Sequence, residues 1–435
     1  MPLLSDAARA AAEGGAFSGR KRLEVQQMRQ DAKIIIHEAL TACLPDAAVR
    51  RALKELPMPR GRLLLLAVGK AAWQMAASAA EVLGERLDAG LVITKYGHCS
   101  GDIPRCEILE AGHPIPDENT FRATERAVSM VSGLRAEDEV LFLLSGGGSA
   151  RVELPLIAPA ELADITRQLL ASGADITEMN TVRKHLSAVK GGRFAALCAP
   201  ARVFSVVLSD IIGDPLDMIA SGPAYPDSST AAQAKAVAVK YDLRLSDEAW
   251  RAMERETPKA LSNVTTTVTG SVRELCKAAA NACERLGYRT IILTDALCCQ
   301  AREAGSFLAS IARTHNGTKE ALAFIAGGET VVRLTGKGLG GRNQELALSA
   351  AAGIAGLAEA LVFSVGSDGT DGPTDAAGGI VDDRTAERLT AQGIYIDQTL
   401  ADNDAYHALQ AVDGLIMTGP TGTNVNDVAV LLLKR

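Results

Sequence analysis

A glycine-rich loop follows a short apolar run in the first half of the chain. Residues 141–144 are typical of a buried parallel strand, and the next residues are Ser145, Gly146, Gly147, Gly148 and Ser149. Glycine adopts positive φ readily, and its backbone N–H groups approach an anion without a Cβ in the way. A helix beginning near Ser149 would add free amides and a favourable dipole. The pattern predicts a loop that binds phosphate groups.

Two further glycine-rich loops also follow apolar runs directly, at residues 327–330 and at residues 366–372. One such loop alone could equally be a structural turn. Three of them at strand ends favour a site for a polyanion. None has the Lys-Ser or Lys-Thr of a Walker A loop, and no G-x-G-x-x-G opens a helix with an acidic residue downstream. The missing G-x-G-x-x-G motif makes a dehydrogenase with a bound dinucleotide less favoured.

Two cations stand where a helix is expected to begin. Lys70 follows the apolar run 63–68, and Arg342 precedes an expected helix over residues 346–352. A cation at a helix start opposes the helix dipole, so these positions suggest function, although Lys70 could also be a solvated lysine. Arg342 suits bidentate binding of a carboxylate or phosphate. Its neighbour Asn343 is a second candidate for binding the substrate.

A strongly basic stretch covers residues 180–193, on an expected helix over residues 176–189. It contains Arg183, Lys184, His185, Lys190 and Arg193. Arg183 and Lys190 are seven residues apart, which places them on one helix face. Such a run is often only a solvated face. The alternative is that Lys184 and Lys190 bind the phosphates of a cofactor.

Carboxylates also follow expected strands. Asp210 comes after the apolar run 202–208, Glu329 lies in the second glycine-rich loop, and Asp368 lies in the third. Mg²⁺ prefers hard oxygen ligands and uses only one or two protein carboxylates, so these three residues are candidate metal ligands. Aspartate in a turn also caps backbone amides, which is the competing explanation for each.

The eight cysteines are scattered and form no CxxC pair, which suits reduced thiols better than a disulfide framework. One set has a loosely zinc-like spacing: His98, Cys99, Cys106 and His113. No close pair of ligands accompanies it. We therefore do not expect a zinc site there.

Composition limits the class of protein. The chain has 435 residues, 47% hydrophobic and 22% charged, with a formal net charge of −7. This length favours two domains, and the acidic balance argues against nucleic-acid or membrane-surface partners. No apolar run is long enough to cross a bilayer. The Ala-rich N-terminus has no apolar core typical of a secretion signal, so we expect a cytoplasmic protein.

Apolar runs alternate with amphipathic segments along the chain. This rhythm predicts an N-terminal arm over residues 1–27, a Rossmann-like, mainly parallel α/β domain over residues 28–258, and a second α/β domain over residues 259–435. Two such lobes imply a cleft between them, with ligands beyond the carboxyl ends of the strands.

Several long motifs resemble a known family. The chain contains SGGGSA, NTVRKHLSAVKGGR, LSDIIGDPLDMIASGPAYPD, GGRNQELAL and SVGSDGTDGPTDAAGG. These are similar to the motifs of the class II glycerate kinases, or glycerate 2-kinases, whose C-terminal part is the MOFRL domain. The resemblance runs from about Met28 to the C-terminus. Members have often been labelled hydroxypyruvate reductases, in the setting of tartrate utilisation.

The resemblance implies ATP- and Mg²⁺-dependent phosphorylation of D-glycerate to 2-phosphoglycerate. It places Lys70, Asp210 and Arg342 at the cleft and the nucleotide phosphates on the SGGGSA loop. The chain departs from the family in two places. Polar Arg151 and Glu153 stand where the family continues with apolar residues, which affects the pocket wall. Residues 298–302 read CCQAR where the family tends to have EGEAR, which removes carboxylates.

We expect in-line phosphoryl transfer, in which positioning and charge neutralisation supply most of the catalysis. Lys70 and Arg342 would hold the glycerate carboxylate and the migrating phosphoryl oxygens. Asp210 would be either the base or a Mg²⁺ ligand, and Glu329 and Asp368 are secondary metal candidates. Two alternatives stay open: an NAD(P)H-dependent hydroxypyruvate reductase and a non-catalytic binder of a phosphorylated metabolite. The chain could be a monomer or a homodimer.

Overall fold

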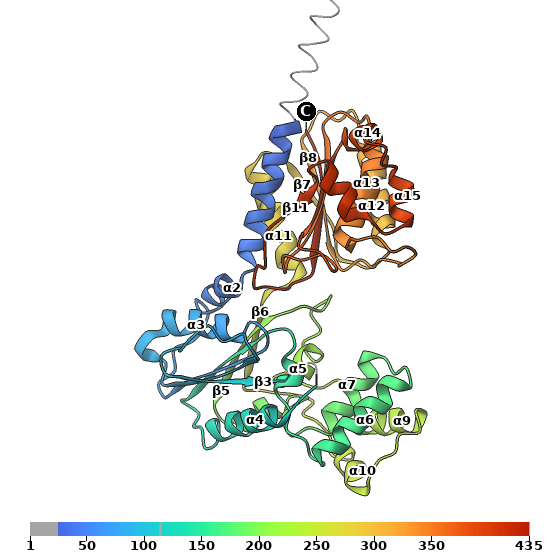
Figure 1. Cartoon of the computed structure of the whole chain (residues 1–435). Helices are drawn as coiled ribbons and strands as arrows, with labels where there is room; N and C mark the ends of the chain where they lie inside the picture. The colour runs from blue at the N-terminus through green and yellow to red at the C-terminus, as the bar shows by residue number, and fades with distance from the viewer. Residues whose placement is uncertain (1–24, 113–114, 435) are drawn as a thin grey trace, which may run out of the picture. The chain divides into compact units, whose positions relative to one another are not determined.

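A computed structural model describes residues 25–112 and 115–434 (Figure 1). By its internal contacts the chain forms two compact units. Residues Pro45–Gly270 form the first, which we call the parallel-sheet unit. The chain before Pro45 and the chain from Ser271 onward form the second, which we call the mixed-sheet unit.

The parallel-sheet unit is built on six parallel strands in the order β3-β2-β1-β4-β5-β6. Every residue of β1 and β4 is buried, as expected for strands with helices on both faces. The strand order reverses between β1 and β4, and such a reversal is where open α/β sheets bind ligands. The predicted Rossmann-like domain is confirmed. The strands are β1 (Leu63–Val68), β2 (Ala89–Lys95), β3 (Cys106–Ala111), β4 (Glu139–Leu144), β5 (Arg202–Leu208) and β6 (Val264–Gly270).

Three groups of helices complete this unit. Helices α2 (Pro45–Ala52) and α3 (Ala72–Leu83) contribute to the core on one face of the sheet. Helices α4 (Glu118–Met130) and α8 (Arg193–Cys198) contribute to the core on the other face. A separate helical core contains α6 (Pro159–Ala171), α7 (Ile176–His185), α9 (Ala231–Lys240) and α10 (Asp247–Met253). Short segments are η1 (Gly84–Arg86), α5 (Gly148–Arg151) and η2 (Ile219–Ser221).

The mixed-sheet unit has strand order β11-β10-β9-β12-β8-β7, in which only the β7–β8 pair is parallel. The strands are β7 (Arg289–Leu297), β8 (Leu322–Gly328), β9 (Ala360–Gly366), β10 (Gly378–Asp382), β11 (Leu415–Ile416) and β12 (Asp427–Leu433). Figure 1 shows α11 (Val272–Arg285) and the helix over residues 25–42 on one face. The other face carries α12 (Ala301–Thr314), α13 (Arg342–Ile354), α14 (Thr385–Ala391), α15 (Ile396–Ala401) and α16 (Ala405–Ala411).

The structural division of the chain differs from the predicted boundaries after residues 27 and 258. Strand β6 lies beyond the second boundary, yet it pairs with β5 and completes the parallel sheet. The helix over residues 25–42 instead buries Met28, Ile35 and Ala39 in a core of the mixed-sheet unit. Local composition marks where an element begins but not which sheet it joins. Most of the predicted arm, residues 1–24, lies outside the described residues.

Several elements also differ in extent from their predictions. The helix expected over residues 176–189 ends at His185, because residues 186–188 pair with residues 154–156 through Leu156 N–Leu186 O and Ala188 N–Leu154 O bonds. Helix α13 begins at Arg342, four residues before the expected start, and strands β10 and β11 were not predicted. In the described ranges, no helix has the length and apolarity that crossing a bilayer requires.

The N-terminal helix offers a matched pair of isoleucines. Ile35 is fully buried against the mixed-sheet unit, whereas Ile34 is 42% exposed. We expect Ile35→Ala to lower the free energy of unfolding by about 2–5 kcal/mol through the lost packing and the cavity. Ile34→Ala should cost no more than about 0.5 kcal/mol. Denaturant unfolding with hydrogen exchange checks both values. Faster exchange confined to residues 45–270 would contradict the assignment of this helix.

Candidate functional site

Three predicted site segments lie at one edge of the parallel sheet. Lys70 follows β1, Ser145–Ser149 follows β4, and Asp210 follows β5. Strand β4 pairs in parallel with both β1 and β5, so the carboxyl ends of all three strands point the same way. The structure therefore brings Lys70, the SGGGSA loop and Asp210 together, at the reversal of strand order.

Close backbone contacts join these segments. The amide of Lys70 donates to the Gly146 carbonyl at 3.0 Å, and the amide of Ala71 donates to Ser145 Oγ at 3.1 Å. A Cβ added at Gly69, whose φ is 128°, would lie 2.2 Å from Ser145 Oγ. A Cβ added at Gly146 would lie 2.3 Å from Asp210 Oδ2. Glycine is thus required at both positions for this close approach.

The loop presents backbone amides. In the described part of the chain, no hydrogen bond uses the amides of Gly146, Gly147 or Ser149. Gly147 has φ 75°, which places it in the left-handed region that favours glycine. Helix α5 has only four residues, so the helix dipole that we expected to assist the loop is short. The unbonded amides are the main anion-binding feature of the loop.

Buried charged side chains support the loop from behind. Arg151 Nη1 donates to the Gly147 carbonyl at 2.7 Å. Lys190 Nζ donates to the carbonyls of Ser149 at 2.6 Å and Val152 at 2.9 Å, and it lies 3.3 Å from Glu153 Oε2. Arg151, Glu153 and Lys190 are all fully buried. These contacts turn loop carbonyls inward, away from any anion bound at the loop.

The charges of this cluster do not balance. Burial lowers the pKa of Arg151 to about 10 and that of Lys190 to about 8, so both remain mainly protonated at neutral pH. Lys190 pairs with Glu153, but Arg151 has no ion-pair partner among the described residues. Its Nε and Nη2 atoms also lack hydrogen-bond partners there. One buried positive charge is therefore left directly behind the phosphate loop.

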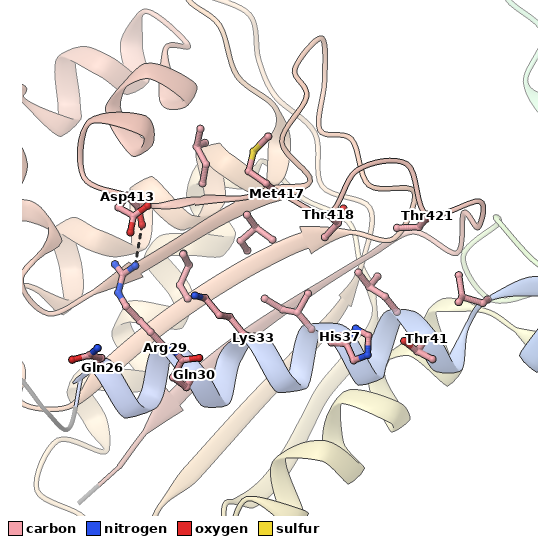
Figure 2. Close-up of a pocket in the computed structure, with 16 residues that line it drawn as sticks. Gln26, Arg29, Gln30, Lys33, His37, Thr41, Asp413, Met417, Thr418 and Thr421 are labelled. Atoms are coloured by element: carbon pink, nitrogen blue, oxygen red, sulfur yellow. Dashed lines mark hydrogen bonds between the residues drawn. The ribbon is translucent and has the colours of Figure 1, made fainter.

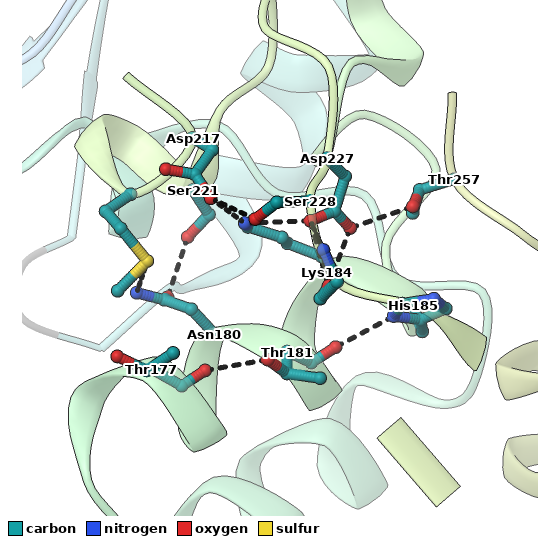
Figure 3. A network of polar contacts seen from close by, with 12 residues as sticks. Thr177, Asn180, Thr181, Lys184, His185, Asp217, Ser221, Asp227, Ser228 and Thr257 are labelled. Atoms are coloured by element: carbon teal, nitrogen blue, oxygen red, sulfur yellow. Dashed lines mark hydrogen bonds and ion pairs between the residues drawn. The ribbon is translucent and has the colours of Figure 1, made fainter. Parts of the chain in front are cut away.

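The structure gives Lys184 and Lys190 surroundings different from those predicted. Lys184 is buried on α7, with Nζ 3.0 Å from Asp227 Oδ1 and 3.4 Å from Asp217 Oδ2 (Figure 3). Burial opposes ionisation of Asp227, but Lys184 and hydrogen bonds from Ser229 and Thr257 keep its pKa below the ordinary value. Lys190 lies beyond the end of α7, so the predicted shared face with Arg183 is wrong. Both lysines are therefore bound to other groups of the protein: Lys184 to carboxylates and Lys190 to loop carbonyls.

A polar chain fixes the hydroxyl of Ser149. Ser221 Oγ donates to Asn180 Oδ1 at 3.1 Å and lies 2.7 Å from Ser149 Oγ. Because Ser221 has one hydroxyl proton, Ser149 must donate to Ser221, which leaves Ser149 oxygen lone pairs available. Ala220 and Ser221 have φ of 52° and 61°, a strained conformation outside glycine. Figure 3 labels Asn180 and Ser221, which lie within two of the motifs quoted above but were not predicted as site residues.

Arg342 lies in the mixed-sheet unit, at the first position of α13. Its Nε and Nη2 atoms bind the two oxygens of Asp427, the first residue of β12, at 2.5 and 3.0 Å. Nη1 lies 3.5 Å from Glu329 Oε1. Burial alone would lower the pKa of Arg342, but Asp427 raises it well above its ordinary value. Asp427 was not predicted as a site residue. An aspartate at the start of an apolar strand is nevertheless a sequence signal for a functional carboxylate.

Asp371 caps the start of α13. Its Oδ1 accepts from the Asn343 amide at 3.2 Å and its Oδ2 from the Gln344 amide at 2.9 Å. Burial raises the pKa of Asp371 to about 6 against the opposing effect of these bonds. Asn343 itself is buried, and its Oδ1 accepts from Ser364 Oγ at 2.6 Å. This predicted substrate ligand therefore has internal partners.

The remaining metal candidates have structural partners. Glu329 Oε2 accepts from Asn426 Nδ2 at 3.4 Å, and Asp368 Oδ1 accepts from the Thr370 amide at 3.0 Å in a turn. Across residues 25–112 and 115–434, no group of three or more His, Cys, Asp or Glu side chains is placed to hold a metal. Of the loosely zinc-like set, His98 Nδ1 lies 3.3 Å from the Lys70 carbonyl, and His113 lies outside the described residues.

A separate groove of about 740 Å³ lies between the helix over residues 25–42 and β11 (Figure 2). Ile36, Leu40 and Ile416 line it together with the polar side chains of Lys33 and His37. It contains none of the predicted site residues. The predicted motifs lie instead at the phosphate loop and at Arg342, outside this groove.

Comparison with known proteins gives two family matches. Residues 31–254 match the domain of unknown function DUF4147, and residues 322–427 match the MOFRL family. The chain is 51% identical over 405 residues to the D-glycerate 2-kinase of Thermotoga maritima, covering 92% of this chain and 97% of that protein. It is 40% identical over 427 residues to the glycerate 2-kinase of Pyrococcus horikoshii, with coverage of 92% and 96%.

Two further matches complete the comparison. A protein of Agrobacterium vitis named "Putative hydroxypyruvate reductase" is 38% identical over 423 residues, covering 93% of this chain and 94% of that one. The crystal structure of Thermotoga maritima glycerate kinase superposes with a TM-score of 0.90 at 50% identity, covering 94% of this chain and 100% of that chain. The chain is thus a two-unit α/β protein of the DUF4147 and MOFRL type. It belongs to the glycerate 2-kinase family, and the resemblance in its motifs is confirmed.

The raised pKa of Asp371 predicts a pH effect on stability. A carboxyl group with a raised pKa in the folded state contributes stability below about pH 4, and this contribution is lost as the pH rises towards about 6. The loss is at most about 3 kcal/mol. Asp371→Asn removes the titration, so its deficit in unfolding free energy relative to the parent should shrink across this range. Denaturant unfolding at a series of pH values checks this. A deficit that grows with pH would contradict it.

Proposed function

We propose that this chain transfers the γ-phosphoryl group of ATP to D-glycerate and produces 2-phosphoglycerate and ADP. The observation that carries the proposal is the SGGGSA loop at the reversal of strand order, with Lys70 and Asp210 on the neighbouring strand ends. The relatives named D-glycerate 2-kinase and glycerate 2-kinase support the reaction class.

The phosphate loop is the proposed nucleotide site. The unbonded amides of Gly146, Gly147 and Ser149 can donate to phosphate oxygens. The carbonyls of Gly147 and Ser149 are bonded to buried cations and do not face the phosphates. Polyphosphate binding here is supported by backbone dipoles and by the positive charge of Arg151 behind them.

Lys70 and Arg342 are the proposed ligands of the anionic groups in the reaction. Lys70 has an exposed side chain next to the loop and suits a migrating phosphoryl oxygen as a point charge. Arg342 is held rigidly by Asp427, which leaves Nη1 as the donor with the weaker internal contact. We propose that this donor binds the glycerate carboxylate, and that Asp427 acts by positioning it.

Asp210 is the proposed acidic residue of the reaction. The hydroxyl oxygen of glycerate attacks the γ-phosphorus, the bond to the β-phosphate oxygen breaks, and the hydroxyl proton leaves to a base. Asp210 touches the loop at Gly146 and is suited either to accept that proton or to hold a cation. A single carboxylate beside a phosphate loop fits Mg²⁺, which keeps most of its ligands from water and phosphate. When bound, Mg²⁺ neutralises phosphate charge.

Substitution of the two cations tests the assignment. Lys70→Ala and Arg342→Ala should each lower kcat/KM for glycerate by about 10²-fold or more, because each removes a charged donor from the proposed site. Asp427→Asn should raise KM for glycerate more than it lowers kcat. ADP release in the presence of ATP and D-glycerate measures all three, and ³¹P NMR identifies the product isomer.

Lys277→Met is the matched control, since Lys277 is an exposed lysine whose ion pair is with Glu274 on the same helix. It should keep the parental rate. Full glycerate-dependent ADP release in Lys70→Ala or Arg342→Ala would refute the residue assignment. Oxidation of NADH by hydroxypyruvate with no ADP formed from ATP and glycerate would replace the kinase by the reductase.

The unpaired charge of Arg151 predicts an effect that depends on ligand charge. Arg151→Met should weaken ATP binding by about tenfold, ADP binding less and AMP binding least, because Coulomb attraction scales with the phosphate charge. Arg151→Lys keeps the charge and should largely restore the series. Isothermal titration of the three nucleotides checks this, and equal losses for all three would indicate a purely structural role.

A further inference from the structure

The groove beside the N-terminal helix has the size of a small-molecule site. It lies between the helix over residues 25–42 and β11, has a volume of about 740 Å³, and belongs entirely to the mixed-sheet unit (Figure 2). Pockets that bind small molecules in proteins have volumes of about 300–1,000 Å³. Neither the phosphate loop nor Arg342 lines the groove. A ligand bound here would therefore be additional to the proposed substrates.

The floor of the groove is aliphatic. Ile36 and Leu40 are four residues apart on the helix and therefore share one face, and Leu415 and Ile416 come from β11. Leu415 is half-buried, and Met417, which follows β11, is 56% exposed. An aliphatic chain lying along this floor would remove apolar surface from water, which favours binding.

Three basic side chains line the helix side of the groove at intervals of one turn: Arg29, Lys33 and His37. Arg29 is already paired, because its Nε lies 2.9 Å from Asp382 Oδ2 and its Nη1 donates to the Asp413 carbonyl at 3.0 Å. Asp413, the acidic residue of the lining, thus lies at the Arg29 end. Lys33 is exposed and has neither a hydrogen bond nor an ion pair among the described residues. One positive charge without a partner therefore stands beside the aliphatic floor.

We propose that this groove binds a monocarboxylate with an aliphatic chain, and that the ligand regulates the binding of glycerate at Arg342. The carboxylate pairs with Lys33, with the His37 ring as a second donor, and the chain lies over Ile36 and Met417. One unpaired cation matches a single negative charge, and the aliphatic floor matches the chain. The regulation rests on the proposed function, whereas the binding site does not.

The segment between β11 and β12 connects the groove to Arg342. Thr421 lines the groove, and its Oγ1 donates to the Ser367 carbonyl at 2.5 Å. Further along the segment, the Val425 amide donates to Ser367 Oγ at 2.8 Å. Asp427, which binds Arg342 through both carboxylate oxygens, follows two residues later. A ligand that holds the groove wall at Thr421 therefore also orders the segment that leads to Asp427.

Isothermal titration with octanoate tests the site. The parent chain should bind octanoate at least about tenfold more tightly than acetate, which lacks the chain, or octanol, which lacks the charge. Lys33→Met should weaken octanoate binding by about tenfold and leave octanol binding unchanged, because it removes the charged donor. Lys277→Met removes an exposed lysine of α11 and should bind octanoate as the parent does. No octanoate binding to the parent, or unchanged binding to Lys33→Met, would overturn the proposal.

Kinetics and hydrogen exchange with octanoate present test the regulation. Saturating octanoate should lower KM for glycerate by about fivefold or more with little change in kcat, and it should slow hydrogen exchange over residues 417–426. Lys33→Met should keep the parental activity without octanoate and lose both effects. Octanoate that binds but changes neither KM nor exchange would overturn the regulation. If no glycerate is phosphorylated, the proposed function fails, while titration and hydrogen exchange still decide whether the groove binds the carboxylate.

Discussion

The phosphate loop depends on buried cations that hold its carbonyl oxygens. Lys190 binds the carbonyls of Ser149 and Val152, and Arg151 binds that of Gly147. A loop that accepts an anion must keep its own partial negative charges away from that anion. Desolvating two cations is costly, and among the described residues Lys190 has a carboxylate partner, Glu153, whereas Arg151 has none. Burying these cations lowers the stability of the fold, but it fixes the orientation of the loop carbonyls and creates a positive potential at the loop.

The surrounding sheet explains why the loop can be shaped this way. Strand order reverses between β1 and β4, so no helix crosses directly above the ends of these two strands. Gly69 and Gly146 then allow the two strand ends to approach more closely than any side chain would permit. The left-handed residues Ala220 and Ser221 press a third segment against the loop. The strained residues and the glycines that permit close approach therefore both lie next to the phosphate loop.

Much of this arrangement could be predicted from the sequence, and the rest has identifiable physical reasons. Continuous apolar runs predicted β1, β4 and β5, and the residues after them gave Lys70, the SGGGSA loop and Asp210. The roles of Lys184 and Lys190 were not predictable, because a basic run looks the same whether its cations are solvated or paired with distant residues such as Asp227. Asp427 opens an apolar strand, which was a signal, but the sequence does not show which cation it pairs with. Its partner Arg342 is 85 residues away.

The two units place their key cations in opposite electrostatic surroundings. Behind the phosphate loop, Arg151 adds charge that no carboxylate balances among the described residues. At the start of α13, the single positive charge of Arg342 has two carboxylate partners, Asp427 and Glu329. A polyphosphate with several charges gains from a net positive potential, whereas a small carboxylate acid gains more from a rigid donor of defined direction. The carboxylate-paired Arg342 therefore favours recognition by geometry, and the unpaired Arg151 favours recognition by charge.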